Sequence, residues 1–216
     1  MYKFLLFVCA LVSFPGHFVW AADLQNTQCD IDKKYYREMP TVKKADEAAE
    51  RKDISAEIKF YKIAVGENNP WAKFMLGLSY LNGQGVAQNV PEAVRLIKSA
   101  AEQDFGESQV TLGFMYDIGR GMPQNYAEAV RWYKSAALKG CADAWRMLSQ
   151  MYVDGKGTPR DIVKAHMWIN LYASRSDDKS AEENRDRLEK MMTPKQLNQA
   201  QQLATKCQAQ NFKNCD

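Results

Sequence analysis

Leu76-Gly77-Leu78-Ser79-Tyr80, followed by Gly83 and Gly85, is the stretch that decides the fold of this 216-residue chain. The pattern returns thirty-six residues later, at 112–121, and thirty-six residues after that, at 148–157. A fixed period of this length is the signature of a repeat array, in which each unit buries its apolar face by stacking on the next. The sequence therefore predicts a solenoid, and this architecture favours binding over chemistry.

Each repeat is expected to contain two helices. In the first helix, Ala72, Leu76 and Tyr80 are four residues apart and therefore share one packing face. Gly83 and Gly85 then end this helix, because glycine adopts positive φ at no steric cost.

The second helix of each repeat has a clear start signal. Asn89, Asn125 and Asp161 are N-cap residues thirty-six positions apart. Glu92 and Glu128 stand three residues after the first two caps, so we expect them to complete capping boxes.

The pattern Leu-Gly-x-x-Tyr-x-x-Gly-x-Gly, followed by Ala-x-x-(Leu/Trp)-x-x-x-Ala-Ala, resembles the Sel-1-like repeat family, a relative of the tetratricopeptide repeat. The resemblance covers about half of the chain. It implies an all-α fold, a right-handed α-solenoid of helix-turn-helix repeats, and a role as an adaptor. One departure is Ser149, which replaces the glycine of Gly77 and Gly113. A unit with no further neighbour is expected to be atypical in this way.

The repeats are flanked by segments of different character. Helical segments on both sides read as caps that shield the open ends of the array. The expected parts are a signal peptide at 1–21, an N-terminal helical cap with a degenerate half repeat at 22–64, three repeats at 65–175, and C-terminal capping helices at 176–216.

The N-terminus reads as an export signal. It has one lysine, an apolar stretch from Phe4 to Val19, and small or apolar residues before a cleavage site that we place after Ala21. No second apolar stretch of spanning length follows, so we expect no membrane insertion after processing. Met192–Leu197 also resembles the closing segment of bacterial members of the family, which implies a periplasmic or secreted bacterial protein.

Four cysteines remain after processing, and their even number in an exported chain suggests disulfides. Cys207 and Cys215 are close in sequence, so we predict that they pair. Cys141 aligns with Phe105, an apolar position, where a buried thiol and a bridge are equally compatible with the sequence, so the pairing of Cys29 and Cys141 stays open. No close cysteine or histidine cluster exists, so the sequence predicts neither a metal site nor a cofactor.

Charge and the catalytic inventory argue against two classes of function, nucleic-acid binding and catalysis. The formal charge is +3, and removing residues 1–21 leaves 28 basic and 26 acidic residues, or +2, interspersed along the chain. This balance gives no case for nucleic-acid binding. His166, the one histidine left after processing, occupies the position of Val94 and Val130, so we expect a packing residue and predict no catalytic residues.

A partner surface is predicted on the first helices. If these helices line the inner surface of the solenoid, the positions one turn away from the packing stripe form a groove that runs from apolar to polar. The alternative is that Met39–Ile54 folds over this groove as a cap. The candidate partner-binding residues are Trp71, Phe74, Leu78, Leu81, Val110, Phe114, Asp117, Arg146 and Gln150.

Three functional hypotheses follow. The leading one is a non-enzymatic periplasmic adaptor that holds a protein partner, such as a component of an envelope complex, in its concave groove. The second is an immunity protein that neutralises a secreted effector such as a lipase, a role known for small exported members of the family. The third, suggested by labels on some relatives, is a hydrolase acting on cell-wall or β-lactam-like substrates.

Overall fold

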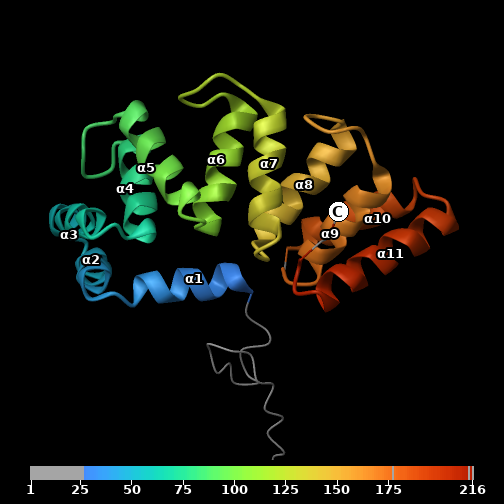
Figure 1. Ribbon diagram of the computed structural model, residues 1–216, viewed down its shortest axis with the longest axis horizontal. Helices are drawn as coiled ribbons and strands as arrows, with labels where there is room; N and C mark the ends of the chain where they lie inside the picture. The colour runs from blue at the N-terminus through green and yellow to red at the C-terminus, as the bar shows by residue number, and fades with distance from the viewer. Residues whose placement is uncertain (1–26, 177, 214, 216) are drawn as a thin grey trace, which may run out of the picture.

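The computed structural model describes residues 27–176, 178–213 and 215, so the predicted signal peptide at 1–21 lies outside the described residues. Within these ranges the protein has eleven helices and no strand, which confirms the all-α prediction. Figure 1 shows the helices following one another along an arch. They are α1 (Gln28–Arg37), α2 (Pro40–Glu50), α3 (Ile54–Gly66), α4 (Pro70–Asn82), α5 (Val90–Glu102), α6 (Gly106–Ile118), α7 (Tyr126–Ala137), α8 (Ala142–Asp154), α9 (Ile162–Ala173), α10 (Lys179–Glu189) and α11 (Pro194–Ala209).

The central six helices form a solenoid of three helical pairs. α4 packs on α5, α6 on α7, and α8 on α9, while α5 and α7 each also contact the first helix of the next pair. The repeated leucines Leu76, Leu112 and Leu148 are buried at these contacts. The same packing contacts therefore recur every thirty-six residues, as the sequence predicts.

Within a pair, a glycine lets the two helices approach closely. A Cβ added at Gly77 would lie 2.7 Å from Ile97 Cγ1, and one added at Gly113 would lie 2.7 Å from Tyr133 Cε1. Neither distance is a normal contact, so a larger residue at either position requires its neighbour to move.

The three predicted N-caps are confirmed, but the two predicted capping boxes are wrong. The side chains of Asn89 and Asn125 accept hydrogen bonds from backbone N–H groups, and Asp161 accepts two. The carboxylates of Glu92 and Glu128 instead pair with nearby arginines at 2.6 and 2.7 Å. The physical reason is that the N–H groups of both asparagines already donate to carbonyl oxygens of the preceding helix, at 2.9 Å in each case.

Helices α2 and α3 close one end of the array, and α10 and α11 pack against α9 at the other. The predicted Cys207–Cys215 disulfide is present next to the end of α11. None of the helices in the described ranges is long and apolar enough to cross a membrane.

Helix α1 takes a path that the sequence does not predict. Cys29, near the N-terminus of α1, forms a disulfide with Cys141, the residue that precedes α8, and its N–H donates a hydrogen bond of 3.0 Å to Lys139 O in the same loop. The helix also contacts α4 and α6, so it crosses the beginnings of all three first helices (Figure 1). The segment considered as a cover, Met39–Ile54, packs instead as α2 on α3.

Candidate functional site

The first helices of the three repeats, α4, α6 and α8, present equivalent positions thirty-six residues apart. Residues at these positions that keep contact with solvent are grouped here under the name first-helix face. Its members are Phe74, Leu78, Val110, Phe114, Asp117, Ile118, Arg146 and Gln150.

Seven of the nine predicted partner-binding residues belong to this face. Phe74, Leu78, Val110 and Asp117 are half-buried. Phe114, Arg146 and Gln150 are exposed, and the exposed fraction of Phe114 is 38%.

The other two predicted residues, Trp71 and Leu81, are buried at 7% and 4% exposure. Leu81 belongs to a core cluster with Leu112 and Met115 of the next repeat, because the stacking of repeats covers its side of the helix. Trp71 is covered by α1. Neither side chain is accessible from solvent on the first-helix face.

The structure adds Ile118, which sequence reasoning missed. It lies four residues after Phe114 on α6 and is 49% exposed, so the two side chains share one face of the helix. The i, i+4 spacing could have indicated it, but Ile118 aligns with Asn82 and Asp154, and the polar character of those positions hid the pattern.

The polar end of the face holds opposite charges close together. Burial raises the pKa of Asp117, and Asp154 raises it further, whereas the ammonium group of Lys156 opposes the change. Lys156 lies 3.4 Å from Asp154, and Gln150 Nε2 donates a hydrogen bond of 2.8 Å to the same carboxylate. This end can therefore accept a basic or polar group beside the apolar pair.

The surface beneath α1 is aromatic. Trp71 and Phe74 of α4 lie about 6 Å from Phe105, which precedes α6, and Tyr36 of α1 completes the cluster with its ring centroid 6.0 Å from that of Phe105. Lys33 and Arg37 lie over the Trp71 ring, at 5.7 and 5.1 Å from its centroid. The cations and the aromatic rings attract each other through the ring quadrupole.

Glu107 also lies under α1, at the beginning of α6. Lys33 Nζ is 3.8 Å from its Oε1, and its buried Oε2 has no hydrogen-bond partner among the described residues. Burial raises the pKa of this carboxyl, while the backbone N–H of Glu107 and the ammonium group of Lys33 act in the opposite direction. The acid is thus incompletely paired.

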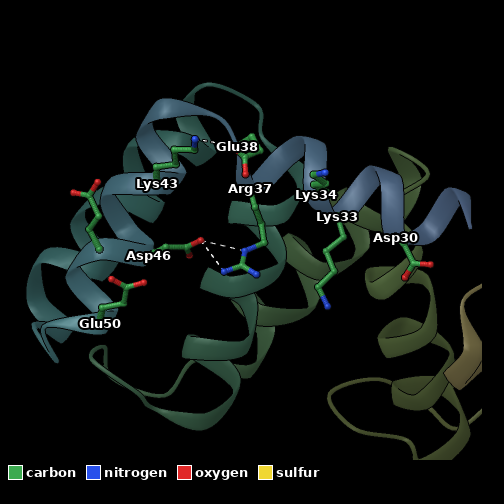
Figure 2. Close-up of a pocket in the computed structure, with 9 residues that line it drawn as sticks. Asp30, Lys33, Lys34, Arg37, Glu38, Lys43, Asp46 and Glu50 are labelled. Atoms are coloured by element: carbon green, nitrogen blue, oxygen red, sulfur yellow. Dashed lines mark hydrogen bonds and ion pairs between the residues drawn. The ribbon is translucent and has the colours of Figure 1, made fainter. Parts of the chain in front are cut away.

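An open hollow of about 480 Å³ lies between α1 and α2 (Figure 2). Arg37 points across it to Asp46, with 2.9 Å between Nη2 and Oδ2, and Lys43 pairs with Glu38 at 2.5 Å. Four basic and five acidic side chains line the hollow, so it offers no single sign of charge to a ligand. Its lining residues are Asp30, Lys33, Lys34, Arg37, Glu38, Lys43, Asp46, Glu47 and Glu50.

His166 is a packing residue, as predicted. Its side chain is 1% exposed, and Nε2 lies 3.0 Å from Oε1 of Glu189 on α10. A group so buried cannot reach a substrate in this conformation. In the ranges that the structure describes, no group of three or more histidine, cysteine or acidic residues is arranged to hold a metal ion.

The helical pairs coincide with a known repeat. Residues 72–105, 106–141 and 142–177 match the family model described as Sel1 repeat. The chain is a Sel1 repeat protein. Each matched segment of this Sel1 repeat protein contains one first helix and one second helix.

Two solved structures are similar to this Sel1 repeat protein. The crystal structure of a Sel1 repeat protein from Oxalobacter formigenes has a TM-score of 0.60 and 28% sequence identity, covering 74% of this chain and 62% of that chain. The crystal structure of c5321, described as a protective antigen present in uropathogenic Escherichia coli strains displaying an SLR fold, has a TM-score of 0.49 and 24% identity, covering 73% of this chain and 41% of that one. This chain therefore spans less than two thirds of either protein. No curated protein sequence gives a significant match.

Sel1 repeat proteins are in general scaffolds for protein–protein interaction. In a Sel1 repeat protein the repeats bury most apolar side chains against each other, so an apolar pair left in solvent is a candidate contact for a partner. The first-helix face carries such a pair. Two disulfides are typical of proteins in oxidising compartments, in agreement with the export predicted from the sequence.

Proposed function

We propose that this Sel1 repeat protein is a non-enzymatic, exported scaffold that acts in the periplasm and binds a protein partner along its first-helix face. The observation that carries this proposal is the exposure of Phe114 and Ile118 on the central helix α6, at 38% and 49%. Burying them against a partner would remove apolar area from water, which is the main favourable term in most protein association.

The surroundings of this pair define what the partner must present. Leu78 and Val110 are half-buried on the same face and extend the apolar surface on one side. Asp117, Arg146 and Gln150 form its polar end. An amphipathic segment with two or three apolar anchors and a polar or basic group beyond them fits this order.

Export is the second part of the proposal. It is supported by the apolar stretch from Phe4 to Val19 with its small residues before Ala21, and by the two disulfides, which require an oxidising compartment to persist. A location in the periplasm follows from the resemblance of Met192–Leu197 to bacterial relatives.

The test is affinity purification of the tagged full chain from periplasm, followed by mass spectrometry. Wild type is compared with Phe114→Asp/Ile118→Asp and with the control Leu138→Asp, whose side chain is 44% exposed at the end of α7. We expect one dominant partner that the double variant loses and the control retains. The same set of proteins with all three chains, or none with wild type, would overturn the proposal.

The identity of the partner distinguishes the two binding hypotheses. A secreted lipase whose activity falls on adding this protein would establish the immunity role. An envelope component that is recovered without loss of any activity would establish the adaptor.

A further inference from the structure

We propose that α1 covers a second interaction surface and that the Cys29–Cys141 disulfide keeps this surface covered. When uncovered, the surface accepts a partner helix that carries an aromatic side chain flanked by basic ones. The surface, called here the α1-binding surface, consists of Trp71, Phe105 and Glu107. It includes neither Phe114 nor Ile118, so this inference does not depend on the function proposed above.

The first argument is that α1 contacts this surface as a docked ligand would. Its Tyr36 packs edge-on against Phe105, while Lys33 and Arg37 lie over Trp71. Asn69 Nδ2 donates a hydrogen bond of 3.1 Å to Tyr36 O. The surface therefore recognises a helix that carries an aromatic residue, a basic residue three positions before it and a second basic residue directly after it.

The second argument is that α1 is held loosely apart from its disulfide. Cys29 is the only residue of α1 that is buried. Ile31 and Tyr35 point to solvent, at 41% and 62% exposure. The ion pairs that join α1 to the repeats and to α9 are those of Asp30 with Arg175, Asp32 with Lys139 and Lys33 with Glu107; they span 3.2 to 3.9 Å, and ion pairs near the surface hold weakly. Arg37 pairs with Asp46 of α2, which is not part of the α1-binding surface.

The third argument is that α1 leaves the surface incompletely satisfied. Lys33 Nζ stays 3.8 Å from Glu107 Oε1, which is beyond hydrogen-bond distance, and Oε2 has no partner in the described part of the chain. A guanidinium group could engage both carboxylate oxygens of Glu107 together. A partner with arginine at the position of Lys33 would therefore bind this surface better than α1 does.

The disulfide decides whether the α1-binding surface is covered by α1 or open to a partner helix. α1 continues into α2 at its C-terminal end, and Cys29–Cys141 fastens its N-terminal end, so a closed disulfide tethers both ends. Closure oxidises the two thiols, which pass two electrons and two protons to a disulfide-bearing oxidant and leave that oxidant as a dithiol. Before closure, or after reduction by a dithiol, only one end of α1 is tethered and a partner helix can compete.

The test uses the full chain and a fluorescent peptide of residues 27–38 with Cys29→Ser. The receptor is an opened chain carrying Cys29→Ser and Cys141→Ser, with Tyr36→Ala and Arg37→Ala to weaken its own α1. By fluorescence anisotropy, we expect the peptide to bind this chain at least tenfold more tightly than the disulfide-closed wild type. Adding Trp71→Ala to the opened chain should abolish binding, and Lys33→Arg in the peptide should strengthen it.

Two results would overturn the inference: no saturable binding to an opened chain that retains its helical circular dichroism, or equal binding to the closed wild type. If the opened chain does not fold, a second experiment on the wild type replaces the binding assay. It measures amide hydrogen exchange with and without dithiothreitol, which reduces the disulfide. On reduction, amides of α1 should lose protection by a larger factor than amides of α4 to α9, whose protection falls only by the stability that the disulfides contribute to the whole fold. Unchanged protection in α1, or the same factor of loss in α1 and in α4 to α9, contradicts the inference.

Discussion

Ser149 Oγ donates a hydrogen bond of 2.8 Å to Ala165 O, across the closest approach between α8 and α9. In the two preceding repeats glycine stands at this position. A Cβ at Gly113 would lie 3.2 Å from Ala129 O, and one at Gly77 would lie 3.4 Å from Ala93 O. Serine is tolerated in the last repeat because its hydroxyl turns this crowded carbonyl contact into a hydrogen bond.

Gly113→Val should destabilise the protein strongly, because valine would press on both the Tyr133 ring and Ala129 O and has no group to donate. Overpacking of this kind costs about 1 to 3 kcal/mol. Gly113→Ser should cost less, since its hydroxyl can reach Ala129 O. Urea unfolding of both variants beside wild type measures the difference, and equal losses would show that the Ser149 bond does not explain the substitution.

Loss of the Cys29–Cys141 disulfide should cost more stability than loss of Cys207–Cys215. The two bridges join residues 112 and 8 positions apart. By loop-closure entropy, these separations correspond to about 5 and about 2.5 kcal/mol. Thermal unfolding of Cys29→Ser/Cys141→Ser and Cys207→Ser/Cys215→Ser gives the order, and a larger loss for the second pair would mean that α1 adds nothing to the folded array.

Glu107→Gln should stabilise the protein at neutral pH. Burial raises the pKa of Glu107 above that of the unfolded chain, so the folded state binds its proton more tightly. The stability contributed by this group is therefore present at low pH and is lost as pH rises through the folded pKa. We expect the gain from Glu107→Gln at pH 7 to shrink towards pH 4 in urea unfolding. Glu102→Gln, exposed on α5, is the control.

His166→Val should raise the melting temperature. His166 Nδ1 is buried and has no hydrogen-bond partner among the described residues, and valine is the residue at the same position of the first two repeats. An unsatisfied buried polar group costs about 1 to 3 kcal/mol. Glu189 keeps Arg185 at 3.7 Å and is partly exposed, so it tolerates the loss of its partner. A lower melting temperature would show that the His166–Glu189 pair outweighs the unsatisfied nitrogen.

The place of His166 illustrates how far a repeat pattern reaches. In the first repeat, the loop of the following unit packs over this position, where Gly121 lies against Val94; in the second, Gly157 of the following loop lies against Tyr126 and Ala127, at the start of the same helix. No further repeat follows α9, and α10 brings Glu189 to the position instead. The pattern predicts correctly that residue 166 is buried, but the partner comes from a segment outside the period.

The sequence by itself determined the features that rest on local or periodic patterns. These are the helical pairs, the three N-caps, the glycines at close approaches and the short Cys207–Cys215 loop, because each depends on residues that lie near each other in the chain or recur at a fixed spacing.

Only the tertiary structure decided where α1 lies, that Cys29 pairs with Cys141 across 112 residues, and that Trp71 is covered whereas Phe114 and Ile118 are exposed. The physical reason is that α1 belongs to no repeat. Its position follows from contacts with three different first helices, and no periodic pattern in the chain encodes contacts between a lone segment and an array.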